Sequence, residues 1–446
     1  MGTMTTTMIR IALPLIALLF ANTAFAQSAP LSVPPVPTLR AQADTRNAIL
    51  RERLDTLVPR LMREQGVDMW ILVAREYMED TVVATMLDAT SFHARRRTIL
   101  VFYDPGEGRP IERLTVSRYG LGGLFAPAWN PVEQPDQWAA LSAIVAERDP
   151  RRIALNRSSL TAFGDGMTAS QYDETVAAIP AQMRDRIVSG EILSTDWLQT
   201  RTAREMALYP QIMRTAHAIL GEALSSRVIT PGRTTTADVQ WWLRQRVAGL
   251  GLGVWFHPSI SISRKGEPQD LDGDTVILPG DLIWSDFGIM YMGLATDTQQ
   301  LAYVLKSGES EAPAGIRAGM AAANQLQDLL TGSFRTGASG NDILAATRES
   351  AIAAGLDPSI YSHPIGFHGH GAGPAIGFWD DQNPSDRGTG PVRVDTAWSI
   401  ELANRMAVPE WDGQRVSFRL EVNAFFDGTT IRYIDGRQTR LHLIGS

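Results

Sequence analysis

Apolar residues recur along the first part of the chain in two periods, which predict where helices and strands alternate. Helical spacing is clear over Thr45–Glu64 and again over Trp138–Glu147. Between and after them lie short apolar runs with the length and composition of buried strands, at 69–73, 98–103 and 153–155. Helices that alternate with buried strands are typical of an α/β fold. The pattern therefore predicts an α/β domain over residues 45–190.

A second unit, residues 196–446, shows a different order of elements. Arg204–Ser225 is periodic like an amphipathic helix, and a second helix follows from Thr236, which we expect to cap it, to Gly249. Strand-like runs come next, at 259–263, 282–287 and 293–303. Another pair of helices is expected at 314–330 and 340–354, and strands follow to the end. Two successive passages from helices to strands within one unit are compatible with an internal duplication.

Composition narrows the possible chemistry. The chain has 446 residues, of which 44% are hydrophobic and 20% charged, and it contains no cysteine. The lack of cysteine excludes disulfides, thiolate zinc sites and cysteine nucleophiles. The net charge is −7, and Lys265 and Lys306 are the only lysines, so no basic patch favours nucleic-acid binding.

The N-terminal segment has the pattern of an export signal. Arg10 precedes an apolar run at 11–21, and Ala24-Phe25-Ala26 supplies the small residues of a cleavage site. We expect a signal peptide over residues 1–26, an uncleaved anchor being the alternative, and a Pro/Ser-rich leader over 27–44. The mature chain should then be periplasmic or secreted by a bacterium, without membrane attachment, because no later apolar run reaches about 18 residues.

Two aspartates in strand-like runs are the first residues that suggest chemistry. Asp286 and Asp297 flank a segment with Gly288 and Gly293 available for turning. A hairpin centred on Tyr291 and Met292 would place the two carboxylates directly opposite each other. Like charges at that spacing destabilise a hairpin unless a cation lies between them. The alternative is a pair of unrelated surface aspartates.

Three histidines lie within eight residues of one glycine-rich segment. His363, His368 and His370 precede Gly371 and Gly373, and glycines allow a backbone to approach a ligand closely. A lone histidine is usually structural, but three together favour metal binding. Either His368 or His370 could be the ligand, and we prefer His370 for its Gly-His-Gly-x-Gly context.

Two glutamates lie inside apolar, strand-like runs further along the chain. Glu401 and Glu421 would each be costly to bury without a cation, a metal ion or a proton. Arg419 lies two residues before Glu421 and shares its face of the strand, so a local ion pair is an alternative.

These residues occur in the order Asp286, Asp297, Gly369–Gly373, Glu401 and Arg419-Leu-Glu421, which resembles metallopeptidase family M24. That family includes methionine aminopeptidase, aminopeptidase P and prolidase. The upstream unit is similar to the N-terminal domain of the aminopeptidase P, prolidase and creatinase branch. The resemblance implies an α/β N-terminal domain followed by an α+β pita-bread catalytic domain. Creatinase lacks the metal ligands, so their presence here implies a metal enzyme.

The resemblance also implies the roles of the site residues. Five of them would hold two divalent ions: Asp286, Asp297, His370, Glu401 and Glu421. Glu401 would also transfer protons. His257 matches the family histidine ahead of the aspartate hairpin, which contacts substrate, and Arg419 matches an arginine two residues before the last ligand in the proline-specific branch, so both are expected as catalytic residues. A site made mostly of carboxylates suits Mn²⁺ best, with Zn²⁺ or Co²⁺ as alternatives.

Two departures from the family pattern concern catalysis. A second histidine usually follows the ligand histidine by about seven residues, but Pro374–Asp380 contains none. His363 or His368 could substitute for it as a catalytic residue. The residues after Glu401 are Leu-Ala-Asn-Arg, where the family commonly has Pro-Gly and Tyr.

We therefore expect an exported dinuclear-metal peptidase that cleaves short peptides with proline at the second position. A prolidase-like dipeptidase, another metal-dependent hydrolase and an inactive homologue that binds peptide or metal are the alternatives. Family relatives are often dimers or tetramers, so a homodimer or homotetramer is possible.

Overall fold

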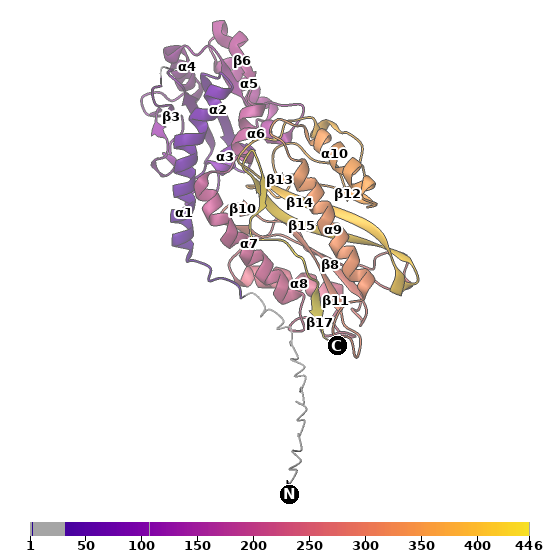
Figure 1. Ribbon diagram of the computed structural model, residues 1–446. Helices are drawn as coiled ribbons and strands as arrows, with labels where there is room; N and C mark the ends of the chain where they lie inside the picture. The colour runs from indigo at the N-terminus through magenta and orange to yellow at the C-terminus, as the bar shows by residue number, and fades with distance from the viewer. Residues whose placement is uncertain (1, 3–31, 107, 446) are drawn as a thin grey trace.

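The computed structural model describes residue 2, residues 32–106 and residues 108–445, and in them the chain forms two large sheets with helices around each (Figure 1), besides a small two-stranded sheet within residues 290–295. The expected signal peptide, apart from Gly2, lies outside the described residues. The strands of the first sheet lie between residues 69 and 189, and those of the second between 259 and 444. An α/β domain thus precedes an α+β domain, as the sequence predicts.

The N-terminal sheet has six strands in the order β4-β3-β2-β1-β5-β6. Their bounds are Met69–Arg75 (β1), Arg97–Tyr103 (β2), Glu112–Thr115 (β3), Ala126–Pro127 (β4), Ile153–Leu155 (β5) and Ile187–Ser189 (β6). Alternate residues of β1 face opposite sides. Trp70 and Leu72 pack with α3 (Thr81–Thr85) and α6 (Glu191–Gln199), whereas Ile71 and Val73 pack with α4 (Gln137–Arg148), so helices cover both faces; α5 (Ala169–Ala178) follows β5 in the chain.

The first helix begins earlier than the sequence pattern suggests. Helix α1 covers Leu39–Glu52, a π-helical segment covers Arg53–Leu57, and α2 covers Val58–Glu64. Thr38 caps α1, since its hydroxyl accepts a hydrogen bond from the Ala41 N–H. The last residues assigned to the leader are therefore helical, because the cap lies upstream of the first apolar-periodic residue.

The second sheet is built from two halves, each with its own pair of helices. Helices α7 (Ala203–Ala223) and α8 (Thr236–Gly249) share a core with β7 (Ser259–Ser263) and β8 (Leu282–Phe287). Helices α9 (Ala314–Ser333) and α10 (Gly340–Ala353) share another with β14 (Thr396–Val408) and β15 (Gln414–Phe426). Thr235, rather than Thr236, caps α8.

The two halves meet between β11 (Thr298–Val304) and β15, where a single residue pair is in register, Gln299 with Glu421. The strand order is β12-β14-β15-β11-β8-β7, with β13, β16 and β17 attached beside it. The remaining bounds are Met290–Tyr291 (β9), Leu294–Ala295 (β10), Pro358–Ile360 (β12), His363–Ile365 (β13), Ile431–Tyr433 (β16) and His442–Ile444 (β17). This arrangement of two sheet halves backed by helix pairs is the pita-bread fold.

Buried charges join the two domains. Arg53 in the π-helical segment and Arg201 after α6 both bind the carboxylate of Glu205 in α7, at 2.8 and 3.0 Å. Arg53 also donates to the carbonyl of Thr200, and all three charged side chains are fully buried. The guanidinium groups therefore lie at the carboxyl end of α6, where a cation is favourable.

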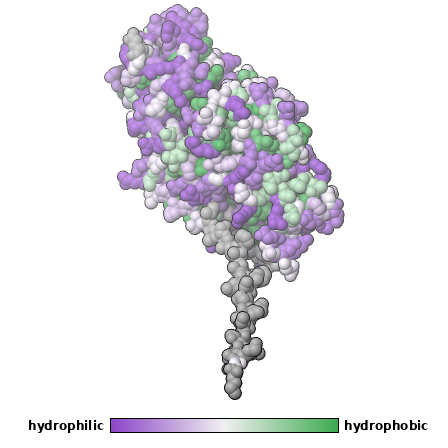
Figure 2. Space-filling model, viewed as in Figure 1, coloured by the Kyte–Doolittle hydropathy of each residue, from purple (hydrophilic) through white to green (hydrophobic). Residues whose placement is uncertain are grey.

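In the orientation of Figure 1, hydrophilic residues cover most of the outer end of the N-terminal domain, while apolar residues are interspersed with polar ones over the second domain (Figure 2). Among the residues that the structure describes, no helix combines the length and apolar character needed to cross a membrane.

Candidate metal centre

The hairpin that carries Asp286 and Asp297 has a different register from the one expected. Its turn is Met292-Gly293, both with positive φ, and Asp286 pairs with Gln299 rather than with Asp297. The expected hairpin was centred one residue too early, which shifts the pairing by two. Because strand side chains alternate with a period of two, Asp297 keeps the same face as Asp286 and becomes its diagonal neighbour.

Glu401 and Glu421 are direct cross-strand partners on β14 and β15. Glu421 is buried, and its carboxylate accepts a hydrogen bond from the hydroxyl of Ser399. The amide of Asn423 donates to the same Ser399 hydroxyl, and its carbonyl oxygen accepts from the backbone N–H of Asp297. Side chains of β14 and β15 thus orient both the carboxylate of Glu421 and the backbone of the hairpin.

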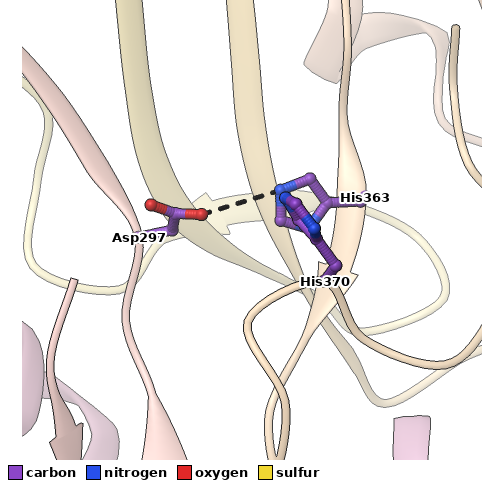
Figure 3. Close-up of side chains that lie close together, drawn as sticks. All are labelled: Asp297, His363 and His370. Carbon is purple, nitrogen blue, oxygen red and sulfur yellow. Dashed lines mark ion pairs between the residues drawn. The ribbon is translucent and has the colours of Figure 1, made fainter. Parts of the chain in front are cut away.

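His363 lies among these carboxylates and is almost completely buried. Its Nε2 is 3.8 Å from an oxygen of Asp297, 3.9 Å from Glu401 and 3.7 Å from Glu421 (Figure 3 shows the Asp297 pair). Its Nδ1 is 3.0 Å from the carbonyl of Pro364, which can only accept a hydrogen bond. Nδ1 therefore carries the proton, and Nε2 presents a lone pair to the carboxylates.

His370 completes the group from the glycine-rich loop. Its ring is perpendicular to that of His363, with centroids 4.8 Å apart, and Figure 3 shows both imidazoles on the same side of Asp297. The glycine before it serves protein packing, because a Cβ at Gly369 would lie 2.2 Å from the indole of Trp255. His368 instead contacts Phe163 of the N-terminal domain and belongs to none of the described groups that could hold a metal ion.

Three overlapping groups of side chains have ligand atoms close enough to share an ion. Within each group these atoms lie within 4.8 Å of one another. The groups are Asp297, His363 and His370; His363, Glu401 and Glu421; and Asp286, Asp297 and Glu421. All five expected ligands are therefore brought together, and His363, expected only as a catalytic residue, joins them.

The electrostatics of the cluster favour a cation. Burial, and then mutual repulsion, raises the pKa of Asp286, Asp297 and Glu401 well above that of a free carboxyl. Burial raises the pKa of Glu421 to about 7 and lowers that of His363 to about 4. Within the described residues, an oxygen of Asp286, an oxygen of Asp297 and Nε2 of His363 have no hydrogen-bond partner. Carboxylates and neutral imidazoles with free donor atoms fit divalent metal ions.

Two further residues that the resemblance singles out, His257 and Arg419, contact side chains outside the cluster. His257 is exposed, and its ring packs on Trp241 and lies 3.2 Å from the guanidinium of Arg244. Arg419 forms an ion pair with Asp270 and lies over the ring of Trp284 at 4.3 Å. The local ion pair considered for Arg419 and Glu421 therefore does not form, because Asp270 takes the guanidinium.

The structure adds two residues that the sequence pattern does not reveal. Gln299 donates a hydrogen bond from its amide to Glu401 at 2.7 Å. Tyr361 lies next to His363 and His370, with ring centroids 5.4 and 5.8 Å away, and stacks on Phe378. A polar residue in a strand and a tyrosine before a histidine carry no distinctive sequence signal.

The fold and the cluster define a class: an α/β domain joined to a pita-bread domain whose two halves form a candidate metal centre. Residues 211–424 match the model of metallopeptidase family M24, and the C-terminal domain of this chain belongs to that family. No curated protein sequence matches the chain.

Solved structures support the fold over almost the whole chain. The X-Pro aminopeptidase of Thermotoga maritima is 16% identical, with a TM-score of 0.61, and the match covers 86% of this chain and 99% of that one. The Xaa-Pro dipeptidase of Bacillus anthracis is 16% identical, with a TM-score of 0.56 and coverage of 90% and 99%. A His243Ala variant of Escherichia coli aminopeptidase P is 11% identical, with a TM-score of 0.58 and coverage of 88% and 96%. At these identities the likeness establishes the fold.

Proposed function

We propose that this chain is a metal-dependent peptidase that hydrolyses peptide bonds next to proline in short peptides. The observation that carries the proposal is the buried cluster in which three candidate ligand atoms have no hydrogen-bond partner among the described residues. Six residues would hold two divalent ions, Mn²⁺ first among the candidates: Asp286, Asp297, His363, His370, Glu401 and Glu421. Bound there, the ions would lower the pKa of a shared water and polarise the scissile carbonyl.

The residues of the chain supply the proton transfers. Glu401 would accept a proton from water and return it to the leaving amine, because Gln299 holds its Oε1 while its Oε2 stays within the cluster, 3.9 Å from Nε2 of His363. Burial raises the pKa of Tyr361 to about 12, so its phenol keeps its proton at neutral pH. We assign Tyr361 the donor role at the tetrahedral intermediate that the missing second histidine would have filled.

One observation favours the dipeptidase variant of this activity. Arg387 is exposed, lies 5.3 Å over the ring of Phe378, and its charge lowers the pKa of His370, after the effects of burial and of His363. A guanidinium at that place can bind the carboxylate of a dipeptide, whereas a longer peptide has its carboxylate further away.

Metal-dependent cleavage tests the proposal directly. The mature chain, residues 27–446, would be loaded with Mn²⁺ or Zn²⁺ and mixed with Xaa-Pro dipeptides and longer Xaa-Pro peptides, with products read by mass spectrometry. Cleavage that Glu401→Gln abolishes, with its bound metal measured, supports the peptidase. Metal-loaded protein that cleaves none of these peptides would overturn it, and the lengths cut separate aminopeptidase from dipeptidase.

We also propose that the protein is exported and that cleavage follows Ala26. The support is the sequence pattern of residues 1–26. N-terminal sequencing of the protein recovered from a periplasmic fraction should begin at Gln27. Recovery of the uncleaved chain from the cytoplasm would contradict the proposal.

A further inference from the structure

Gln299 is the neutral member of a row of acidic side chains that crosses both halves of the sheet. The register places Gln299 opposite Asp286 on one side and opposite Glu421 on the other, and Glu421 is opposite Glu401. Directly opposed residues project from the same face. Gln299 is buried, at 3% exposure, and belongs to the only residue pair in register between the two halves in the described part of the chain.

The orientation of the Gln299 amide follows from its neighbours. The indole N–H of Trp284 lies 3.0 Å from Oε1 of Gln299, and an indole nitrogen can only donate. Oε1 must therefore face Trp284, which turns the NH₂ group toward Glu401. The resulting hydrogen bond joins Nε2 of Gln299 to Oε1 of Glu401 at 2.7 Å.

The ring of Trp284 packs against Arg419, which is held by an ion pair. The guanidinium of Arg419 lies 4.3 Å over that ring, and Asp270 pairs with that guanidinium. Asp270 also accepts a hydrogen bond from the hydroxyl of Ser263 on β7. A cation held by a carboxylate against an aromatic face is a stable contact, so the indole has a defined position from which to orient Gln299.

The two carboxylate oxygens of Glu401 consequently have different partners. Oε1 is committed to Gln299, while Oε2 is the oxygen that lies 3.9 Å from Nε2 of His363. Partners of this kind, which orient a ligand without touching the metal, typically change metal affinity or activity by about 10–100-fold when removed.

We propose that Gln299, oriented by Trp284, is a positioning residue that holds one oxygen of Glu401 and leaves the other for the metal ion. The inference rests on the proposed metal-dependent function. It also gives Arg419 an indirect role: Arg419 packs on Trp284, which orients Gln299, and does not itself contact the carboxylates of the row.

The test compares Gln299→Met, which keeps the length of the side chain and removes its donor, with Gln299→Glu, which adds a fourth carboxylate to the row. Gln300→Met is the matched control, because Gln300 is the next residue, is also buried at 7% exposure, and bonds His442 away from the cluster. Each full-length variant would be titrated with Co²⁺, and the visible absorption and the affinity against a chelator recorded, together with kcat and KM.

We expect Gln299→Met to shift the Co²⁺ absorption, to weaken metal binding by about 10–100-fold, and to lower kcat more than it changes KM. Gln299→Glu should perturb the absorption further, Trp284→Phe should produce a smaller change of the same kind, and Gln300→Met should match the wild type. A Gln299→Met protein with the absorption and affinity of the wild type would overturn the inference.

The outcomes separate this inference from the proposed function. Wild-type protein that binds Co²⁺ but cleaves no peptide would refute the peptidase, while the absorption and affinity of the variants would still decide the role of Gln299. Wild-type protein that binds no Co²⁺, Mn²⁺ or Zn²⁺ would overturn both.

Discussion

Removal of divalent ions should make the stability of this protein fall as the pH rises. The carboxyl groups of the cluster have a higher pKa in the folded chain than in the unfolded one, chiefly because they are buried. Between the two pKa values the folded state binds more protons than the unfolded state, so each rise in pH favours unfolding. The stabilisation is complete below about pH 4.5 and is lost as the pH passes through the folded pKa.

Glu421 makes a contribution to this effect whose size follows from its pKa. Burial raises its pKa from 4.5 to about 7. At about 1.4 kcal/mol per pH unit, this rise corresponds to about 3 kcal/mol of unfolding free energy lost by pH 8. A bound divalent cation reverses the sign, because it requires the ionised carboxylates and binds only the folded chain.

The assay is urea unfolding of the chelated protein at pH 6 and pH 8, with and without added Mn²⁺. Glu421→Gln is the control, because it has a similar shape and cannot ionise, so its pH dependence should be smaller than that of the wild type. Mn²⁺ should stabilise the wild type at pH 8. A chelated wild type with the pH dependence of Glu421→Gln would refute the reasoning, as would Mn²⁺ that leaves the stability at pH 8 unchanged.

Three further substitutions test other parts of the structure. Glu205→Ala leaves two buried arginines without their carboxylate and should lower the unfolding free energy by about 3–5 kcal/mol, measured by urea titration; a loss below about 1 kcal/mol would show that the helix end alone holds the arginines. Tyr361→Phe should lower kcat by about 10²–10³-fold with little change in KM, and an unchanged kcat would remove Tyr361 from the reaction. His363→Ala should lower the metal content measured by mass spectrometry, whereas His368→Ala should retain it; equal effects of the two would contradict the ligand assignment.

Helices and strands that depend only on the local pattern of apolar residues could be predicted from the sequence. Strand β7 and the ends of β8 agree with the apolar runs at 259–263 and 282–287, because a buried strand needs only a short run of apolar residues with breakers beside it. The candidate ligands Asp286, Asp297, His370, Glu401 and Glu421 could also be found, since their order along the chain resembles that of a family. A single carboxylate residue within an apolar, strand-like run is unusual enough to be recognised from the sequence alone.

The tertiary structure decided which atoms meet. The hairpin register depends on positive φ at Met292 and Gly293, and methionine gives no signal of such a turn. The position of His363 depends on its pairing with Ser399 across β13 and β14, and the role of Gln299 depends on contacts with residues 15 and 102 positions away. Periodicity along one strand says which face a side chain occupies, but cross-strand partners are set by the pairing of segments far apart in the chain. The sequence by itself therefore determined many of the elements, the fold and most of the candidate metal ligands, and the pairing of the two sheet halves determined the geometry of the site.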